Sequence, residues 1–411
     1  MSVEMSIAVF RPASLRVHCN KPSLKPMDIQ TRMRRRQSDT DDTLVLEQEA
    51  ISPVAHVADP VGRGTTLERL LDYLEPMLNG TLPPEAYIWG PAGAGKSAVV
   101  AALFAQLQSQ QSRPGSIIHT ASPPNRDHPQ SVVYVDARSA TSDFGLYHAV
   151  LDELIETAVP TKGVRTETMR DRLQEALGPC SKQVLVAVDH IGEAETMPLS
   201  ELAEKFEDID TGLSWVAIGR SDPASLDSKP PTKRIRIPAY DRQALIDIIT
   251  SRALSGLGPH TLEHRHARHI AEWADGNAHD ALAALFTAAD RVVDRGRSTI
   301  RKVDIRAALE ATPRAGVALG KVLLLPDSRQ RVLRALVDIG DGERSPVSAV
   351  ASKIADDDDV DLSAGTVKRY LYELAEDGIV ERIQIDESTQ GRPPSRIEPQ
   401  FPTYVFERLA D

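Results

Sequence analysis

The sequence of 411 residues contains only two cysteines, Cys19 and Cys180. A disulfide framework or a zinc cluster built on cysteine would need more, so both are excluded. No apolar run approaches the roughly 18 residues of a membrane-spanning helix. Lys21 and Lys25 follow the weakly apolar N-terminal segment rather than preceding it, which is not the pattern of a signal peptide. These absences predict a cytoplasmic protein with no membrane partner.

Aromatic residues are also few, at 4%, so the cores must consist of Ala, Val, Leu and Ile. Lysine is scarce: it supplies 12 of the 48 cations, in a chain of net charge −11. An acidic, arginine-rich surface keeps a protein hydrated in a high-salt cytoplasm, which indicates a salt-loving archaeal source. Acidity by itself argues against a nucleic-acid binder, but in such a cytoplasm it says little about the ligand.

The first 50 residues differ from the rest in charge. Residues 1–38 hold eight cations and two acids, and the cations include a run at Arg32–Arg36. We expect residues 1–50 to be a flexible basic tail. Contact with phosphate and a merely solvated extension are both open interpretations of this tail.

Hydrophobic periodicity divides the remaining chain into three units, as its length also suggests. Within residues 51–238, apolar runs alternate with segments of helical spacing, which predicts an α/β domain with a parallel sheet. Residues 239–315 are helical throughout, and residues 320–411 are helical first and then strand-like. The predicted strands of the first unit are Ala86–Trp89, Val132–Val135, Val184–Val188, Trp215–Ile218 and Arg234–Ile237. Its predicted helices include Leu67–Leu78, Ala98–Leu107 and Tyr147–Ala158.

The strongest motif follows the first predicted strand and fits G-x-x-x-x-G-K-[ST] in full. Its residues are Gly90, Pro91, Ala92, Gly93, Ala94, Gly95, Lys96 and Ser97. Glycines let backbone N–H groups surround phosphate oxygens, and the helix that follows adds its positive N-terminus. Lys96 would reach the β- and γ-phosphates of ATP, and Ser97 would bind Mg²⁺. The motif predicts a site for ATP or ADP.

A phosphate loop also needs an acid at the end of a buried strand to hold Mg²⁺. Asp189 follows the apolar run Val184–Val188 and supplies that acid. The alternative is a polar residue that merely ends a strand.

Several segments, taken in order, resemble the AAA+ ATPases, and specifically the archaeal replication initiators of the origin-recognition/Cdc type. They are Gly62–Gly64, Tyr134–Arg138, Arg234–Tyr240, Ala244–Arg252 and Gly276–Leu282, with a winged-helix-like C-terminal region. The resemblance implies an AAA+ domain, an all-helical lid and a winged helix. It also implies ATP and Mg²⁺ as cofactors, duplex DNA and other replication proteins as partners, and lid residues at the nucleotide. Those lid residues are Tyr240, Arg252 and His279.

Three catalytic positions depart from the family pattern. The family pair Asp-Glu is Asp189-His190 here, so His190 must orient water without a fixed negative charge. The nearest match to the sensor asparagine is Asp222, and His279 stands where the lid arginine belongs. We therefore expect nucleotide binding with slow or lost hydrolysis, although slow hydrolysis with shifted roles stays open. Glu193 and Glu195 lie beyond the position of the usual glutamate.

The C-terminal unit predicts a helix-turn-helix with a β-wing. Ser363 would cap the third helix, Ala364–Glu376, and predicted strands Ile379–Ile385 and Tyr404–Leu409 would flank a polar turn at 387–396. The expected DNA contacts are Thr366, Lys368 and Arg369 on the helix and Arg392 and Arg396 in the turn. Residues 320–411 carry 12 cations and 18 acids, so a unit that docks a protein is the alternative.

Two functions fit these observations. The first is an ATP-switched replication initiator-like protein that binds origin DNA through the winged helix. The second is a nucleotide-regulated transcription or adaptor protein whose winged helix reads a promoter or docks a partner.

Overall fold

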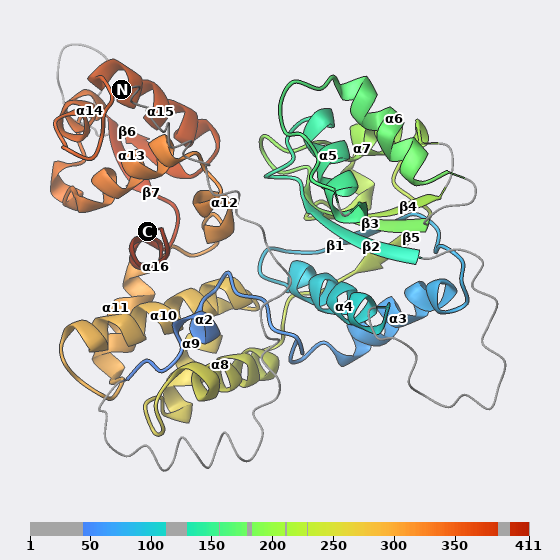
Figure 1. Cartoon of the computed structure of the whole chain (residues 1–411). Helices are drawn as coiled ribbons and strands as arrows, with labels where there is room; N and C mark the ends of the chain where they lie inside the picture. The colour runs from blue at the N-terminus through green and yellow to red at the C-terminus, as the bar shows by residue number, and fades with distance from the viewer. Residues whose placement is uncertain are drawn as a thin grey trace, which may run out of the picture.

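The computed structural model describes residues 44–111, 130–155, 157–178, 183–209, 212–227, 229–384 and 395–410. Figure 1 shows three bodies: a base around a sheet, a helical lid, and a C-terminal unit above the lid. The Arg32–Arg36 run and Arg392 lie outside the described residues. Within the described part of the chain, no helix has both the length and the apolar character needed to span a bilayer.

The base is a five-stranded parallel sheet with strand order β2-β3-β4-β1-β5. Its strands are β1 Ala86–Trp89, β2 Gln130–Asp136, β3 Gln183–Ile191, β4 Leu213–Gly219 and β5 Lys233–Arg236. The α/β prediction is confirmed, and each predicted strand overlaps an observed one. Strand β3 is buried from Val184 to Asp189, as expected for a central parallel strand covered on both faces.

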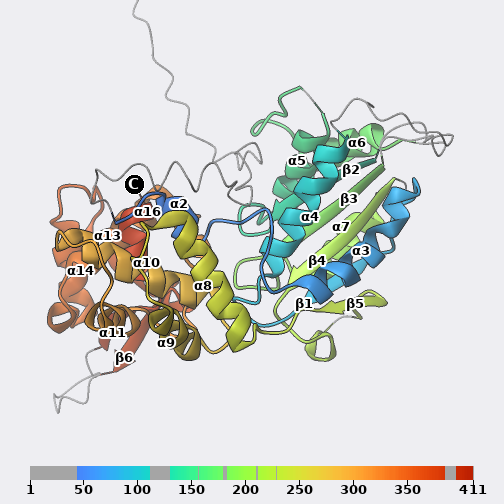
Figure 2. The same ribbon diagram turned by 90° about the horizontal axis from the view of Figure 1, so that it is seen from below.

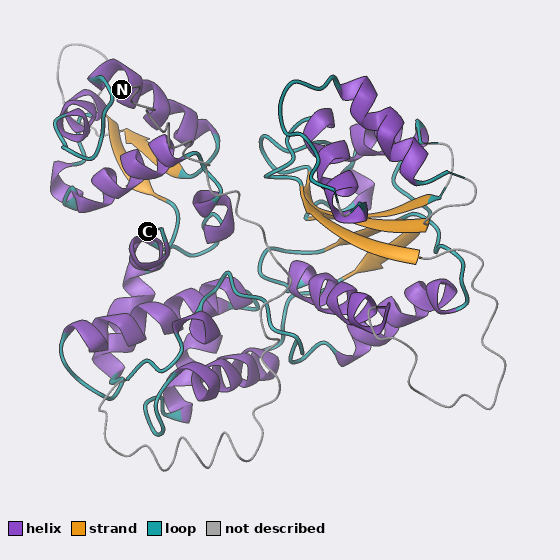
Figure 3. Ribbon diagram, viewed as in Figure 1, coloured by secondary structure: helices purple, strands orange, loops and turns teal. Residues whose placement is uncertain are grey.

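Helices cover both faces of this sheet (Figure 3). One face packs against α3 Gly64–Leu78 and α4 Lys96–Gln111, and the other against α5 Asp143–Leu154, α6 Thr166–Ala176 and α7 Leu199–Glu207. Because parallel strands all end at one edge, the phosphate loop after β1 and Asp189 in β3 are brought together there.

The lid comprises α8 Arg242–Gly256, α9 His264–Ala274, α10 Ala278–Asp294 and α11 Lys302–Ala311. Side-chain caps begin two of these helices, with Asp241 accepting from the Ala244 N–H and Asn277 from the Asp280 N–H. The short helix α2, Gln48–Ile51, packs against α8, and the Leu46 N–H donates to the Gly256 carbonyl at 2.8 Å. The assignment of residues 44–50 to a flexible tail is therefore wrong: Leu44 and Ile51 are buried in the lid core.

The C-terminal unit contains α12 Leu319–Leu323, α13 Asp327–Asp338, α14 Val347–Ala355, α15 Ala364–Glu376, β6 Val380–Gln384, β7 Ser395–Pro399 and α16 Thr403–Leu409. Strands β6 and β7 pair antiparallel. The order of three helices and a two-stranded ribbon is consistent with a winged helix. Ser363 caps α15 by accepting from the Thr366 N–H.

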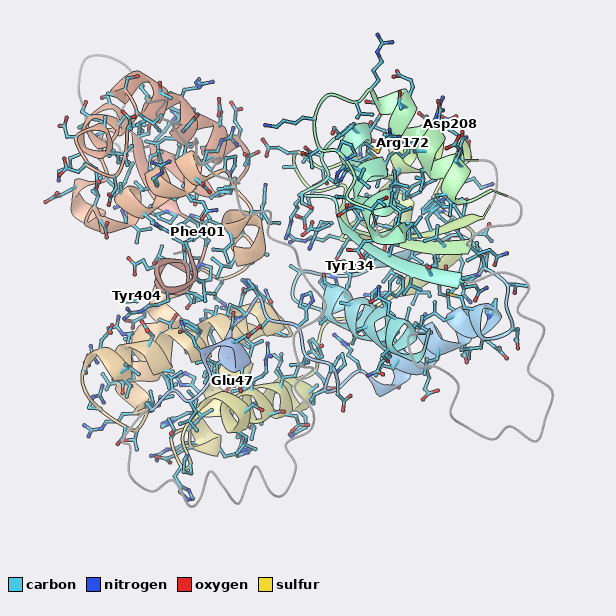
Figure 4. All side chains as sticks on the ribbon, in the orientation of Figure 1. Glu47, Tyr134, Arg172, Asp208, Phe401 and Tyr404 are labelled. Atoms are coloured by element: carbon cyan, nitrogen blue, oxygen red, sulfur yellow. The ribbon has the colours of Figure 1, made fainter. Side chains whose placement is uncertain are left out.

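One strand prediction in this unit is wrong. Residues Tyr404–Leu409 lie in helix α16, and the second strand is β7, which begins in the last two residues of the predicted turn and runs on to Pro399. Val405 and Phe406 suggested a strand, but they are buried residues of a helix that begins after Pro402, and the Phe406 ring packs against Phe401. Figure 4 labels Phe401 and Tyr404 beside this helix. Arg291 on α10 donates to the Tyr404 hydroxyl at 2.7 Å, so the lid and the C-terminal unit share one continuous core.

Candidate nucleotide site and nucleic-acid interface

The phosphate loop lies between the base and the lid. Its backbone is left-handed at Gly93 (φ +64°) and Gly95 (φ +73°), where a side chain would be strained. A Cβ at Gly93 would collide with the Asn277 side chain, and one at Gly95 would collide with the Tyr240 hydroxyl. The Ala278 N–H at the start of α10 also donates to the Gly93 carbonyl at 3.1 Å. The lid therefore contacts the loop directly.

Lys96 occupies the center of this loop. Its Nζ donates to the Gly90 and Pro91 carbonyls, both at 2.8 Å, and the side chain is 8% exposed. Burial lowers the pKa of Lys96 to about 8, although Asp189 opposes the shift. An ammonium that is buried between carbonyls is suited to bind a phosphate. The negative charge of the phosphate would favour the protonated form of Lys96, which burial alone disfavours.

Asp189 is buried beside Lys96 and anchors a cluster of oxygen atoms. The Tyr134 hydroxyl on β2 donates to Asp189 Oδ2, and Ser97 lies near enough to this carboxylate to lower its pKa. Burial acts to raise the pKa of Asp189, but His190, Ser97 and Tyr134 outweigh it and hold the pKa below its ordinary value. The carboxylate is therefore ionised next to a serine hydroxyl.

His190 and Glu193 form a second polar group next to Asp189. His190 is left-handed at φ +64°, and its Nδ1 lies 3.4 Å from Glu193 Oε1. Arg138 donates to Glu193 Oε2 at 2.6 Å, and Arg220 lies 3.0 Å from Oε1. Burial would raise the pKa of Glu193, but His190 and the two arginines lower it to about 2. So weak a base is poorly suited to accept a proton from water.

Of the predicted lid residues, Tyr240 contacts the nucleotide site and Arg252 does not. Tyr240 is at the site: Arg63 stacks 3.5 Å from its ring centroid and donates to the Ala94 carbonyl at 2.6 Å. Arg252 instead donates to the carbonyls of Ser52 and Ala55, at 3.0 and 2.6 Å. Arg252 thus fastens the segment before the base onto the lid.

His279 also makes contacts that its predicted role did not include. Its Nε2 accepts from the Leu319 N–H at 3.1 Å, and its Nδ1 lies 3.3 Å from Asp280 Oδ1. Through the Leu319 N–H, this ring joins the lid to α12. Asp222, the nearest match to the sensor asparagine, caps the short helix η1, Pro223–Ser225, by accepting from the Ala224 N–H at 2.9 Å.

The predicted DNA residues on α15 lie among acids and aromatic rings. Arg369 is 63% exposed, but its Nη1 lies 3.5 Å from Glu373 Oε1. Lys368 Nζ lies 6.0 Å from the Tyr372 ring centroid, and Thr366 shares a hydrogen bond with Ser363. Arg396 lies in β7 rather than in the turn and is ion-paired with Glu398.

The loop after β3 also reaches the C-terminal unit. Arg329 on α13 lies 2.9 Å from Glu373 and 4.0 Å from Glu195. Glu195, whose backbone is left-handed at φ +64°, therefore faces Arg329 of the C-terminal unit. The loop that follows β3 and carries Glu193 thus extends to an ion pair with the C-terminal unit.

Sequence reasoning missed several residues of this site. Arg63 lies within a glycine pair whose role the sequence leaves unspecified. Tyr134 is the one aromatic residue of β2, and Arg138 follows that strand closely. The sequence shows that Tyr134 lies in a predicted strand and that Arg138 follows it, which marks both as candidates for the site. Their pairing with Asp189 and Glu193 depended on the order of the strands in the sheet.

The chain is similar to a known family of domains and to several known proteins. Residues 59–215 match the AAA ATPase domain family. The chain is 24% identical to ORC1-type DNA replication protein 11 of Haloarcula marismortui, over 85% of this chain and 87% of that protein. It is also similar to the solved structure of Aeropyrum pernix ORC1 in complex with DNA, with TM-score 0.58, 19% identity, and coverage of 90% of this chain and 97% of that one.

A second solved structure is the Aeropyrum pernix ORC2 protein, described as ADPNP–ADP complexes. The TM-score is 0.53 at 17% identity, covering 89% of this chain and 97% of that chain. At these identities, the two structures establish the likeness of fold.

Proposed function

We propose that this chain, which belongs to the archaeal origin-recognition/Cdc-type family of AAA+ ATPases, is an ATP-binding, replication initiator-like protein that engages duplex DNA. The observation that carries this proposal is the phosphate loop, in which Lys96 is buried between two backbone carbonyls beside the ionised Asp189. Relatives of similar length bear the name of replication proteins, and a neighbour of the same fold is described in complex with DNA.

ATP would bind where the base meets the lid. Backbone N–H groups of the loop and Lys96 would hold its phosphates, and release of Lys96 from the Gly90 and Pro91 carbonyls would accompany their entry. Because Asn277 and Ala278 touch Gly93, a change in the loop is passed directly to α10. We infer that the nucleotide sets the angle between base and lid through this contact.

The residues present also fit Mg²⁺. Ser97 and Asp189 offer the oxygen ligands that a hard cation prefers, and the described residues contain no cluster of acids and histidines that could hold a metal by themselves. This donor set suits an ion that is completed by phosphate and water. Mg²⁺ would neutralise phosphate charge, while Tyr134 keeps the Asp189 carboxylate oriented.

Hydrolysis is proposed to be slow. His190 replaces the usual glutamate, and the negative charge of Glu193 is balanced by ion pairs with Arg138 and Arg220. His279 stands where the family has an arginine and is bound to the Leu319 N–H, so the phosphates lack the permanent cation of the arginine. Both the base that would activate water and the cation that would stabilise the transition state are thus weakened.

A second function has an observation in its favour. Four cations of the C-terminal unit are ion-paired with acids of the same unit: Arg329 and Arg369 with Glu373, Lys353 with Glu343, and Arg396 with Glu398. A transcription or adaptor protein that docks a partner through this unit would need few free cations. A footprint of the protein across the genome of its own cells separates the two functions, with Lys96→Ala as the comparison. Protection of repeated origin-like DNA that is lost in Lys96→Ala supports the initiator, and protection confined to promoters contradicts it.

A further inference from the structure

The edge strand of the sheet carries a run of cations that the nucleotide site does not use. Residues 229–240 contain Lys229, Lys233, Arg234 and Arg236 and no acid, within a chain of net charge −11. All four side chains are exposed. We call these four residues the basic edge.

The basic edge borders the sheet on its open side. Strand β5 pairs only with β1, and Figure 2 shows it at the margin of the sheet. Ile235 turns inward to the core beneath α3, so the alternation of the strand directs Arg234 and Arg236 to the opposite face. Arg236 lies there 5.3 Å from the Trp89 ring centroid. Arg234 and Arg236 thus share one face of the strand, and Lys233 is exposed at its beginning on the face of Ile235.

These cations also lack acidic neighbours. Arg220 and Arg242, on either side in sequence, are ion-paired with Glu193 and Glu272. Across the described ranges, no acidic side chain lies within ion-pair distance of the basic edge. Arg69 on α3 adds a fifth cation at this margin, since its Nη1 donates to the Arg236 carbonyl at 3.3 Å.

The cations of the basic edge differ from Arg369 and Arg396 of the C-terminal unit in their ion pairing. Binding to a nucleic-acid backbone depends on cations that replace counterions, and a cation already paired with an acid releases fewer of them. Arg369 and Arg396 are paired in this way, whereas the basic edge is not. We propose that the basic edge is a second DNA contact, which binds the phosphate backbone of a duplex without reading its sequence. This inference rests on the proposed function, because it assumes a protein that binds duplex DNA.

The spacing of the edge fits a phosphate backbone. Side chains two residues apart on a strand, such as Arg234 and Arg236, are about 6.6 Å apart. Cations at this spacing on an extended strand can each face a separate phosphate of a regularly charged backbone. The charge and spacing would be the same for any sequence.

The test is fluorescence anisotropy of the full chain on a labelled 40-base-pair duplex across a salt series. The edge variant is Lys233→Gln/Arg234→Gln/Arg236→Gln. Its matched control removes three exposed lid cations, Arg268→Gln/Lys302→Gln/Arg306→Gln. Each lost phosphate contact lowers the log–log salt slope by about 0.9, so we expect the edge variant to lose about 2.7 and the control almost nothing. The affinity of the edge variant should fall at least tenfold at low salt, equally for all sequences.

The outcomes separate this inference from the proposed function. Failure of the unchanged protein to bind any duplex would contradict the proposed function itself. Normal DNA binding by the edge variant, with the slope of the unchanged protein, would overturn only the edge. The same holds if the variant keeps its DNA affinity but loses binding to poly-glutamate, since the edge would then bind an acidic protein. Arg234→Gln alone should lower the slope by about 0.9, and its Mg-ATP thermal shift should match that of the unchanged protein.

Discussion

The Tyr134 hydroxyl on β2 donates a hydrogen bond to the buried carboxylate of Asp189 on the neighbouring strand β3. Tyr134→Phe removes the donor and leaves the ring in place. We expect a loss of about 1.5–3 kcal/mol in the free energy of unfolding, because the acceptor is charged and buried. Urea denaturation measures it. Tyr87→Phe on β1 is the control, since its hydroxyl donates to the uncharged Ser221 carbonyl. An equal loss in both variants would show that the charge of Asp189 is not involved.

The phosphate loop predicts a thermal shift on nucleotide binding. Mg-ATP at a hundredfold excess over Kd should stabilise the protein by about 2.7 kcal/mol. Lys96→Ala should remove most of that shift, because Lys96 is the cation between the loop carbonyls. Lys302→Ala, an exposed lid substitution, should leave it unchanged. A native protein whose melting temperature ignores Mg-ATP would contradict the nucleotide site.

The replaced catalytic residues predict slow turnover. We expect the native protein to hydrolyse ATP far below the about 1–100 s⁻¹ of kinases. His190→Glu should raise the rate if the missing base is what limits it. A steady-state phosphate-release assay compares the two. Rapid hydrolysis by the native protein would refute the prediction and direct attention to Glu193 or Glu195.

Glu193 predicts an acid-sensitive contribution to stability. Its pKa falls from an ordinary 4.5 to about 2 in the folded protein because His190, Arg138 and Arg220 outweigh burial. A lowered folded pKa means that the contribution is fully present above about pH 4.5 and is lost as the pH falls toward 2. The melting temperature of Glu193→Gln should thus lie below that of the native protein at pH 7. The difference should shrink between pH 4.5 and 2, and a constant difference would argue against the ion pairs.

Helix α15 predicts sequence preference. Arg369→Ala should relax the preference among duplexes by about 1–3 kcal/mol if Arg369 reads a guanine, once it leaves Glu373. Arg392→Ala should weaken binding to all sequences alike, since the residue is predicted to contact phosphate. Competition between specific and random duplexes distinguishes these two effects. Unchanged DNA affinity after deletion of residues 320–411 would instead indicate that this unit docks a partner protein.

The sequence predicted the parts of this protein that depend on short-range patterns. Strand β1 and helix α15 have the predicted bounds, because apolar runs and caps are local signals. Helix α16 could not be predicted in this way: Val405 and Phe406 favour a strand locally, and only their burial against Phe401 makes a helix suitable. The same reason hid the pair of Tyr134 and Asp189, which are 55 residues apart in the chain.

The roles of the predicted site residues divide in the same way. Lys96 and Ser97 belong to one contiguous motif, so the sequence identifies them directly. Asp189 lies beside them because parallel strands end at the same edge of the sheet. Arg252 belongs to a helix whose orientation the sequence does not contain, and its guanidinium turns to the carbonyls of Ser52 and Ala55 instead. The site residues proposed for nucleotide and DNA stay predictions until the variants above are measured.

The packing of residues 44–51 on α8 makes the base an insertion within the lid. Arg252 and Ser52 are bonded although 200 residues separate them in the chain. At about 5–20 residues per second, a ribosome needs roughly 10–40 seconds to make the intervening segment. Residues 44–51 therefore cannot pack until α8 has been made. If the base has already folded, the flexible chain that joins residues 44–51 to α8 is effectively shorter. We therefore expect the base to fold first and the lid second, so that a slow-folding base would delay the lid however stable the lid itself is.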